Sequence, residues 1–353
     1  MKILTINPGS TSTKFALYDN LQKVGSETIR HSVEELAPLT CIADQFEFRR
    51  NMVLKVLEEN NVPLDFDAVV GRGGLVKPIP GGVYRVNEQM IQELTDTPRQ
   101  HASNLGCRLA HDIASRIDGC VALIADPVTV DELDDIARIS GAPEMPHYAT
   151  WHALNQRAIA RRFATDQGKK YDELNLIIAH LGGGISVGAH RQGKCVDVNN
   201  ALDGDGPISP ERAGSLLSGS LVDMCFSGKY TRAEMKKRLC GNAGLAAHLG
   251  STDMIEIERW IEEGNEKARL VVDAMSYQVA KSIGALAAAL AGKVDAILLT
   301  GGVAYSDYVV PRVIERVQFI APVHVYAGED EMLALAQNGQ AALQGDLPIK
   351  EYA

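Results

Sequence analysis

One pattern of strands and glycine turns occurs twice along this chain of 353 residues. Each half opens with three short apolar runs separated by turn residues, which predict a meander of three strands. The expected strands are 2–7, 15–18 and 23–29, then 176–179, 185–190 and 194–198. Each meander is followed by a strand that runs into glycines, DAVVGRGG at 67–74 and DAILLTGG at 295–302. Two matches in the same order predict a duplicated α/β domain.

The length fits two domains, at about 150 residues each. We expect an N-terminal domain at 1–150 and a C-terminal domain at 151–329. A helical pattern at 330–344 predicts a last helix, and residues 330–353 are expected to pack back on the first domain. Two facing copies would form a cleft lined by the glycine turns, because ligands gather at strand ends in α/β sheets.

Composition excludes several classes of function. Lysine plus arginine is 35 and aspartate plus glutamate is 45, a net charge of −10 that argues against a nucleic-acid surface. The most apolar segment, 283–291, is far shorter than the ~20 residues of a membrane span. No signal peptide pattern opens the sequence, so a cytoplasmic protein without a membrane partner is expected. The six cysteines contain no CxxC pair and are typical of reduced thiols.

Two turns carry residue types that suit phosphate binding. Asn7–Lys14 (NPGSTSTK) combines hydroxyls, backbone amides and a cation, which suit phosphate oxygens. It is not a Walker A motif, because Lys14 leads into a strand. His180–Gly184 (HLGGG) has three glycines in a row, which favour close approach of the backbone to a ligand. For Asn7–Lys14 the alternative is a surface turn rich in serine and threonine.

Further candidates are single polar residues near strand ends and glycine turns. Asp126 ends an apolar strand, which suits a catalytic or metal site but also a helix cap. Glu331 begins the last helix, where an acidic residue often only complements the helix dipole. Arg72 lies among glycines and is either an anion ligand or an exposed surface arginine. The histidines form no metal set, and His101 and His152 are interpreted as structural.

Four segments together carry a family resemblance. They are MKILTINPGSTSTK at 1–14, GRGGLVKPIPGG at 71–82, HALNQRAIAR at 152–161 and HLGGGISVGA at 180–189. The whole chain resembles the acetate and butyrate kinases of the actin- and hexokinase-like superfamily, and the butyrate branch most. The resemblance implies two duplicated ribonuclease H-like (actin-like ATPase) domains around a cleft. It also implies reversible, Mg²⁺-dependent transfer of the ATP γ-phosphoryl group to a short-chain carboxylate, giving an acyl phosphate and ADP, in a homo-oligomer of at least two chains.

The resemblance also implies roles for individual residues. The first phosphate-binding turn would contain Asn7, Ser10, Ser12 and Lys14, and the second His180, Gly182, Gly183 and Gly184. Gly301 and Gly302 would form the adenosine-binding turn. Arg212 matches the arginine that clamps the transferring phosphoryl group, and Asp126 matches the catalytic aspartate. Glu331, with Asn7, would hold the magnesium ion.

The chain departs from the acetate kinase pattern at three positions. The family's first-domain arginine falls near Val69, so Arg72 is the nearest candidate. An active-site histidine falls at Tyr148, and Gly183 replaces an asparagine. These departures favour the butyrate branch, but acid chain length and branching stay open. The alternatives are a kinase that prefers acetate or propionate, a non-catalytic ATP-binding module, and a sugar or glycerol kinase.

Overall fold

The computed structural model describes residues 1–39 and 41–353, which divide into two compact units. Unit 1 contains Met1–Val130 and Asp330–Ala353, and unit 2 contains Asp131–Glu329. Residues 131–150, which the sequence pattern assigns to the first domain, therefore lie in unit 2. There Arg157 forms an ion pair with Glu132 at 3.0 Å, and both side chains are 9% exposed.

Unit 1 is built on a mixed sheet of seven strands in the order β12-β5-β6-β4-β1-β2-β3. The strands are β1 (Lys2–Pro8), β2 (Ser12–Asp19), β3 (Gln22–Arg30), β4 (Ala68–Arg72), β5 (Val83–Arg85), β6 (Val121–Ala125) and β12 (Ile349–Lys350). Strands β1, β2 and β3 form the predicted antiparallel meander. Strand β4 runs parallel to β1, and β6 runs parallel to β4.

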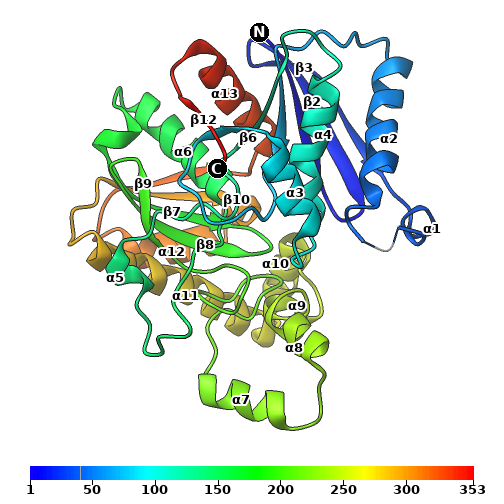
Figure 1. Cartoon of the computed structure of the whole chain (residues 1–353). Helices are drawn as coiled ribbons and strands as arrows, with labels where there is room; N and C mark the ends of the chain where they lie inside the picture. The colour runs from blue at the N-terminus through cyan, green and yellow to red at the C-terminus, as the bar shows by residue number, and fades with distance from the viewer. Residues whose placement is uncertain (40) are drawn as a thin grey trace. The chain divides into compact units, whose positions relative to one another are not determined.

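Unit 2 repeats this arrangement in a five-stranded sheet of order β11-β10-β7-β8-β9 (Figure 1). Its strands are β7 (Asn175–Leu181), β8 (Ile185–Arg191), β9 (Lys194–Val198), β10 (Ala296–Gly301) and β11 (Val323–Ala327). Strands β7, β8 and β9 form an antiparallel meander, and β10 and β11 continue parallel to β7. The core order β6-β4-β1-β2-β3 of unit 1 thus matches β11-β10-β7-β8-β9, and the predicted α/β duplication is confirmed.

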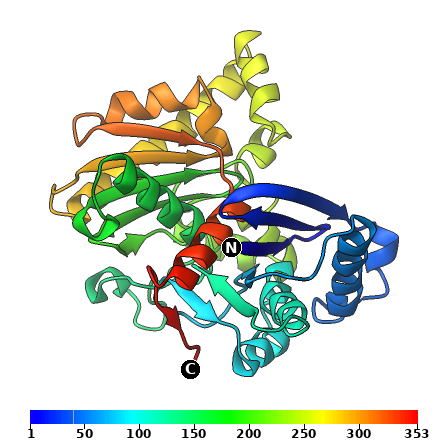
Figure 2. The same cartoon turned by 90° about the horizontal axis from the view of Figure 1, so that it is seen from above.

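Helices cover both faces of the unit 1 sheet. They are α2 (Gln45–Glu59), α3 (Glu88–Asp96), α4 (Leu105–Ala114) and α13 (Glu331–Gln344), while the short α1 (Val33–Leu36) buries none of its residues. Leu4 and Ile6 of β1 face the core shared with α2, α3 and α4. Helix α13, red in Figure 2, crosses the other face, where a Cβ added at Gly339 would lie 2.7 Å from Val70. The small residue therefore lets the helix pack closely on the sheet.

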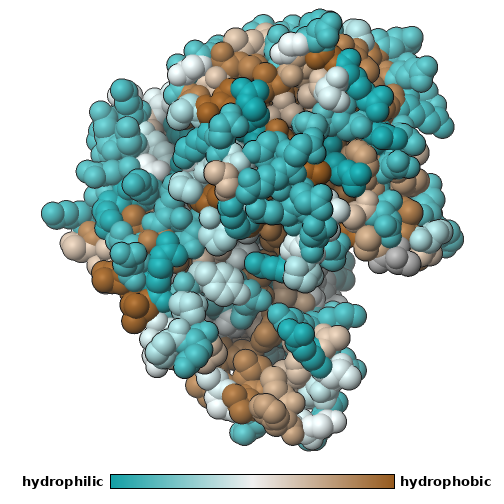
Figure 3. All heavy atoms as spheres, viewed as in Figure 1, coloured by the Kyte–Doolittle hydropathy of each residue, from teal (hydrophilic) through white to brown (hydrophobic). Residues whose placement is uncertain are grey.

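Unit 2 has the same layers. Its helices are α5 (Asp135–Arg138), α6 (Ala153–Asp166), α7 (Ser218–Phe226), α8 (Arg232–Leu239), α9 (Gly244–Leu249), α10 (Met254–Glu262), α11 (Glu266–Ala289) and α12 (Val309–Val317). Ile177 and Leu181 face the core with α11 and α12, and Ile178 faces α6. Helix α7 buries none of its residues, and the apolar surface that it contributes is visible in Figure 3. Of the helices in the described part of the chain, none has the length and apolar character needed to cross a membrane.

The predicted turn at 71–74 begins later than expected. Gly71 and Arg72 belong to β4, which pairs with β1 and β6 on its two sides. A Cβ at Gly71 would lie 2.1 Å from the carbonyl oxygen of Gly106 in α4. This glycine is therefore required for close packing of α4 on β4. Strands β5 and β12 escape sequence prediction because they are only three and two residues long.

Candidate active site

Three predicted residues lie at the carboxyl ends of neighbouring parallel strands in unit 1. Asn7 is near the end of β1, Arg72 ends β4, and Asp126 follows β6. The register aligns them, because Ile6 pairs with Gly71 and Arg72 pairs with Ala125. This edge of a parallel sheet is where α/β proteins bind ligands.

Glu331 joins two of these residues. Its carboxylate accepts a hydrogen bond of 2.6 Å from the Asn7 side-chain amide and forms an ion pair with Arg72. Capping of α13 is done by Asp330 instead, whose side chain accepts from the backbone N–H of Leu333. Glu331 therefore has specific side-chain partners as well as its place at the helix start.

The side-chain oxygens of Glu331 and Asn7 are of a kind that suits a magnesium ion. A carboxylate and an amide oxygen are the hard ligands that Mg²⁺ takes from a protein, while water and phosphate oxygens complete its shell. Among the described residues no group of three or more His, Cys, Asp or Glu side chains is placed to hold a metal. The chemistry of Asn7 and Glu331 thus suits a metal carried by the nucleotide better than a closed protein site. Lys14, directly opposite Asn7 on β2, adds a cation on the same face of the sheet.

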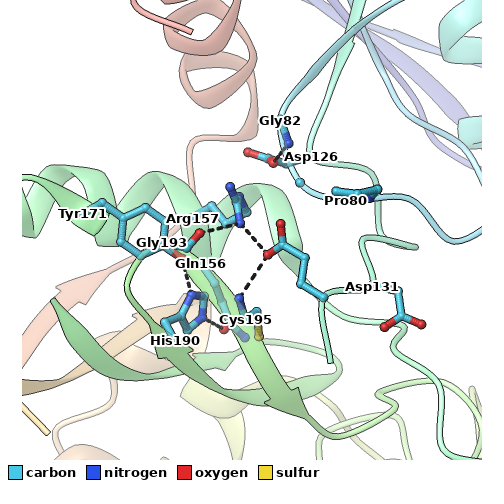
Figure 4. A network of polar contacts seen from close by, with 12 residues as sticks. Pro80, Gly82, Asp126, Asp131, Gln156, Arg157, Tyr171, His190, Gly193 and Cys195 are labelled. Carbon is cyan, nitrogen blue, oxygen red and sulfur yellow. Dashed lines mark hydrogen bonds and ion pairs between the residues drawn. The ribbon is translucent and has the colours of Figure 1, made fainter. Parts of the chain in front are cut away.

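Asp126 is held in a strained conformation. It is 1% exposed, and its φ of +40° lies in the left-handed region, which costs energy for a residue other than glycine. Its carboxylate accepts from the backbone N–H of Gly82 at 2.8 Å (Figure 4), and its own N–H donates to the Gly82 carbonyl at 3.0 Å. Strain of this kind is concentrated at functional sites.

His101 contacts the same region, although the sequence suggests a structural role. His101 is exposed at the surface, and partial desolvation, followed by the positive charge of Arg72, lowers its pKa. Its Nδ1 atom lies 2.7 Å from the Ser103 hydroxyl at the start of a short helix. The neutral imidazole is therefore favoured beside Arg72.

In unit 2, His180 lies at the end of β7 in a set of polar side chains. Its Nδ1 atom is 2.8 Å from Asn155 Oδ1, and its Nε2 atom is 3.4 Å from a carboxylate oxygen of Glu329. The ring stacks on His152, with centroids 3.8 Å apart and planes 11° from parallel. The interpretation of His152 as merely structural missed this contact. His152 and Asn155 are three residues apart at the start of α6, so they share a helix face, but this spacing alone does not report that both contact His180.

A chain of hydrogen bonds leads from this pair to the buried His190, and its last step, from Gln156 to His190, is visible in Figure 4. Ser186 Oγ is 2.8 Å from His152 Nδ1 and accepts from Gln156, whose Oε1 is 2.9 Å from His190 Nε2. Burial, and then the charge of Arg157, lower the pKa of His190 to about 3. The neutral ring must therefore donate to Gln156 through Nε2.

The glycine turn at 182–184 packs against the segment that carries Arg212. Ser209 donates its hydroxyl to the Gly183 carbonyl at 2.7 Å, and the N–H of Glu211 donates to the same oxygen at 3.0 Å. A Cβ at Gly184 would lie 2.0 Å from Arg212 Nη1, so the guanidinium rests on this glycine. The third glycine of the turn is therefore needed to make room for Arg212.

The Arg212 guanidinium uses only part of its hydrogen-bond donors within the described structure. Its Nη1 donates to the carbonyl of Ala201, while its buried Nε has no partner in the described structure. No carboxylate among the described residues forms an ion pair with it. An unpaired guanidinium beside a glycine turn is suited to binding an anion.

The two glycines that end β10 differ. Gly301 has φ +91°, and a Cβ there would lie 2.4 Å from the Leu181 carbonyl, so the protein itself requires glycine. A Cβ at Gly302 would meet nothing within 4 Å. The exposed surface at Gly302 is thus free of protein atoms, as a bound base or ribose would need.

The first phosphate candidate turn lies between β1 and β2. Ser10 and Thr11 are exposed, and among the described residues none accepts a hydrogen bond from their backbone N–H groups. Tyr148, where the resemblance places a histidine, donates its hydroxyl to Asp203 at 2.7 Å in unit 2. The predicted residues thus fall into sets within each unit: Asn7, Lys14, Arg72 and Glu331 in unit 1, and His180, Gly182–Gly184 and Arg212 in unit 2.

The sequence is similar to known kinases along its whole length. Residues 147–343 match the Acetokinase family. A probable butyrate kinase of Bacteroides thetaiotaomicron is 60% identical over 352 residues, covering 100% of both chains. Butyrate kinase 2 of Clostridium acetobutylicum is 52% identical over 353 residues, covering 99% of each.

Solved structures with the same fold include two carboxylate kinases. Acetate kinase of Porphyromonas gingivalis superimposes with a TM-score of 0.79 at 21% identity, covering 97% of this chain and 99% of the other. A propionate kinase from Francisella tularensis has a TM-score of 0.76 at 18% identity, with 96% and 98% covered. At these identities the likeness establishes the fold.

Proposed function

Because the chain belongs to the Acetokinase family, we propose that it transfers the terminal phosphoryl group of ATP to butyrate or a similar short-chain acid. The products are an acyl phosphate and ADP, and the reaction is reversible. The observation that carries this proposal is the unpaired Arg212 guanidinium resting on the second glycine turn. Identity of 52–60% to proteins named as butyrate kinases supports butyrate over acetate or propionate, which remain the alternative acceptors.

The reaction is a direct displacement. An oxygen of the ionised carboxylate forms a bond to the γ-phosphorus, while the bond from that phosphorus to the β–γ bridging oxygen breaks and ADP leaves. No general base is required, because a free carboxylic acid has a pKa of about 4.3, like glutamate, and is ionised at neutral pH. The obstacle is instead repulsion between two anions, which cations must neutralise.

In unit 2, Arg212 is the clamp on the oxygens of the transferring group. Such an arginine contributes on the order of 10³-fold or more to turnover. His180 hydrogen-bonds the same group, held by Asn155. Gly182, Gly183 and Gly184 form the second phosphate-binding turn, and Gly301 and Gly302 bind the adenosine.

In unit 1, Ser10, Ser12 and Lys14 bind phosphate oxygens, and Arg72 binds the carboxylate. Asn7 and Glu331 hold Mg²⁺, which supplies charge neutralisation on the phosphate oxygens when bound. Asp126 orients the metal shell or an arginine instead of accepting a proton. We also propose a cytoplasmic homo-oligomer. The apolar side chains of Leu217 and Phe226, 80% and 87% exposed, support association between chains, because it would remove them from water.

The direct test is acyl phosphate formation. Purified protein is incubated with ATP, Mg²⁺ and each straight or branched acid from two to six carbons, and the product is trapped with hydroxylamine. We expect the highest kcat/KM with butyrate or a branched acid of similar size. ATP binding without acid-dependent turnover would instead favour a non-catalytic module, and ADP release that depends on a hexose or glycerol would favour a sugar kinase.

A further inference from the structure

Arg49 is a fully buried arginine directly behind the turn at 9–12, between β1 and β2. It lies on α2 and is 0% exposed. Its Nη1 donates to the carbonyl oxygens of Gly9 and Ser12, both at 2.8 Å, and its Nη2 donates to the Ser10 carbonyl at 3.1 Å. One side chain thus holds three carbonyl groups of the turn toward the interior.

This arrangement determines where the N–H groups of the turn point. In a trans peptide the N–H of the next residue is opposite to the carbonyl. The N–H groups of Ser10 and Thr11 therefore point away from Arg49, toward the exposed side of the turn. The Thr11 carbonyl is also occupied, since it accepts from the backbone N–H of His31 at 2.9 Å. Successive outward N–H groups of this kind form a concave site for an anion.

The charge of Arg49 has no negative partner in the described structure. Its remaining hydrogen bonds go to neutral oxygens, at 2.8 and 3.0 Å to Gln45 Oε1 and at 3.0 Å to Thr13 Oγ1. No ion pair with a carboxylate is formed among the described residues. Burial lowers the pKa of Arg49 to about 10, so the guanidinium stays charged at neutral pH. An unpaired buried charge is costly, and an anion on the far side of the turn would offset that cost.

We propose that Arg49 is a positioning residue for the phosphate chain of the nucleotide: it orients the turn at 9–12 and supplies a positive charge behind it. The inference rests on the proposed function, since it assumes that a nucleotide occupies the turn. Two roles of Arg49 can be told apart by experiment. A scaffold role needs only the hydrogen bonds of Arg49, whereas the proposed role also needs its net charge.

Gln45→Glu tests the charge with little change of shape. The new carboxylate would pair with Arg49 through the hydrogen bonds that Gln45 Oε1 already accepts. We expect KM for ATP to rise, and the affinity for inorganic tripolyphosphate to fall, on the order of tenfold, while the thermal unfolding temperature does not decrease. Gln22→Glu adds the same charge at an exposed position of β3 and should leave KM and affinity unchanged.

Arg49→Met removes both the charge and the hydrogen bonds. We expect a larger rise in KM for ATP than in Gln45→Glu, together with a lower unfolding temperature. Arg50→Met is the matched control, because Arg50 lies next on α2 but pairs with Asp112 instead. Arg49→Lys, which keeps the charge but fewer hydrogen bonds, should recover part of the tripolyphosphate affinity.

The outcomes separate this proposal from the proposed function. A folded Gln45→Glu variant with wild-type KM for ATP and wild-type tripolyphosphate affinity overturns the role of Arg49, whatever Arg49→Met does. If the wild-type protein forms no acyl phosphate, the proposed function fails. The tripolyphosphate titration still decides the role of Arg49 in that case, since it needs no turnover.

Discussion

A single methyl group at Gly184 should separate catalysis from folding. In Gly184→Ala the new Cβ would lie 2.0 Å from Arg212 Nη1 and 2.1 Å from its Cζ. Ordinary van der Waals contact begins at 3.4 Å, so the guanidinium must move by about 1.4 Å. It is the far end of a flexible side chain, and the movement costs the fold little.

The same movement is large for a reacting group. A misplacement of about 1 Å at a catalytic group costs on the order of 100-fold in rate. We therefore expect kcat for acyl phosphate formation to fall about 100-fold in Gly184→Ala, with an unfolding temperature close to that of the wild type. The loss should be smaller than in a variant that lacks the Arg212 guanidinium, because the charge is displaced and not removed.

The assay is hydroxylamine trapping of the acyl phosphate at saturating ATP and acid, paired with a thermal melt of each variant. Gly284→Ala is the control, because a Cβ at this position of α11 meets nothing within 4 Å and an alanine favours the helix. Wild-type kcat in Gly184→Ala would refute the reasoning that Arg212 acts from its position on the glycine turn. A large drop in unfolding temperature would refute the claim that the side chain gives way.

Three further predictions follow from the same sites. Arg212→Ala should lower kcat on the order of 10³-fold with the fold intact in circular dichroism, and retained turnover would remove Arg212 from the site. Glu331→Gln should raise the Mg²⁺ concentration needed for half-maximal rate, measured by Mg²⁺ titration at fixed ATP; an unchanged titration would argue against a metal role. Because the pKa of His190 is lowered to about 3 in the folded chain, the unfolded chain binds the extra proton first as pH falls below ~6.5, and stability is lost. The free energy of unfolding in urea should fall between pH 7 and pH 5 by about 2 kcal/mol more in the wild type than in His190→Gln. An equal fall in both proteins would contradict this prediction.

Local sequence signals predicted most of the architecture. Alternation of apolar residues, followed by turn residues, located the strands of both meanders, because side-chain period and turn chemistry act over a few residues. The short strands β5 and β12 were not predicted, since three or two residues show no period. Gly71 was interpreted as part of a turn, and its true constraint, the carbonyl of Gly106, comes from a helix that lies elsewhere in the sequence.

The candidate site divides in the same way. The glycine turns and the residues at strand ends could be predicted from the sequence, because neighbouring residues in the chain form the pattern that identifies them. The stacking of His152 on His180 and the burial of Arg49 were not visible, because neither position carries a local pattern that reports its neighbours. Both depend on how helices α6 and α2 pack on their sheets.

By itself, the sequence determined that this chain folds as a duplicated α/β protein. It also predicts two turns that bind phosphate and the residues that would serve them. Only the tertiary structure decided which of those residues meet. Glu331 reaches Asn7 across 324 residues because α13 packs on β1, and this contact pairs the two candidate metal ligands. Arg212 stays without a carboxylate partner in the described structure, whereas Arg72 has one. Such differences in charge pairing arise from packing between distant segments, since hydrogen bonds and ion pairs act only over a few ångströms.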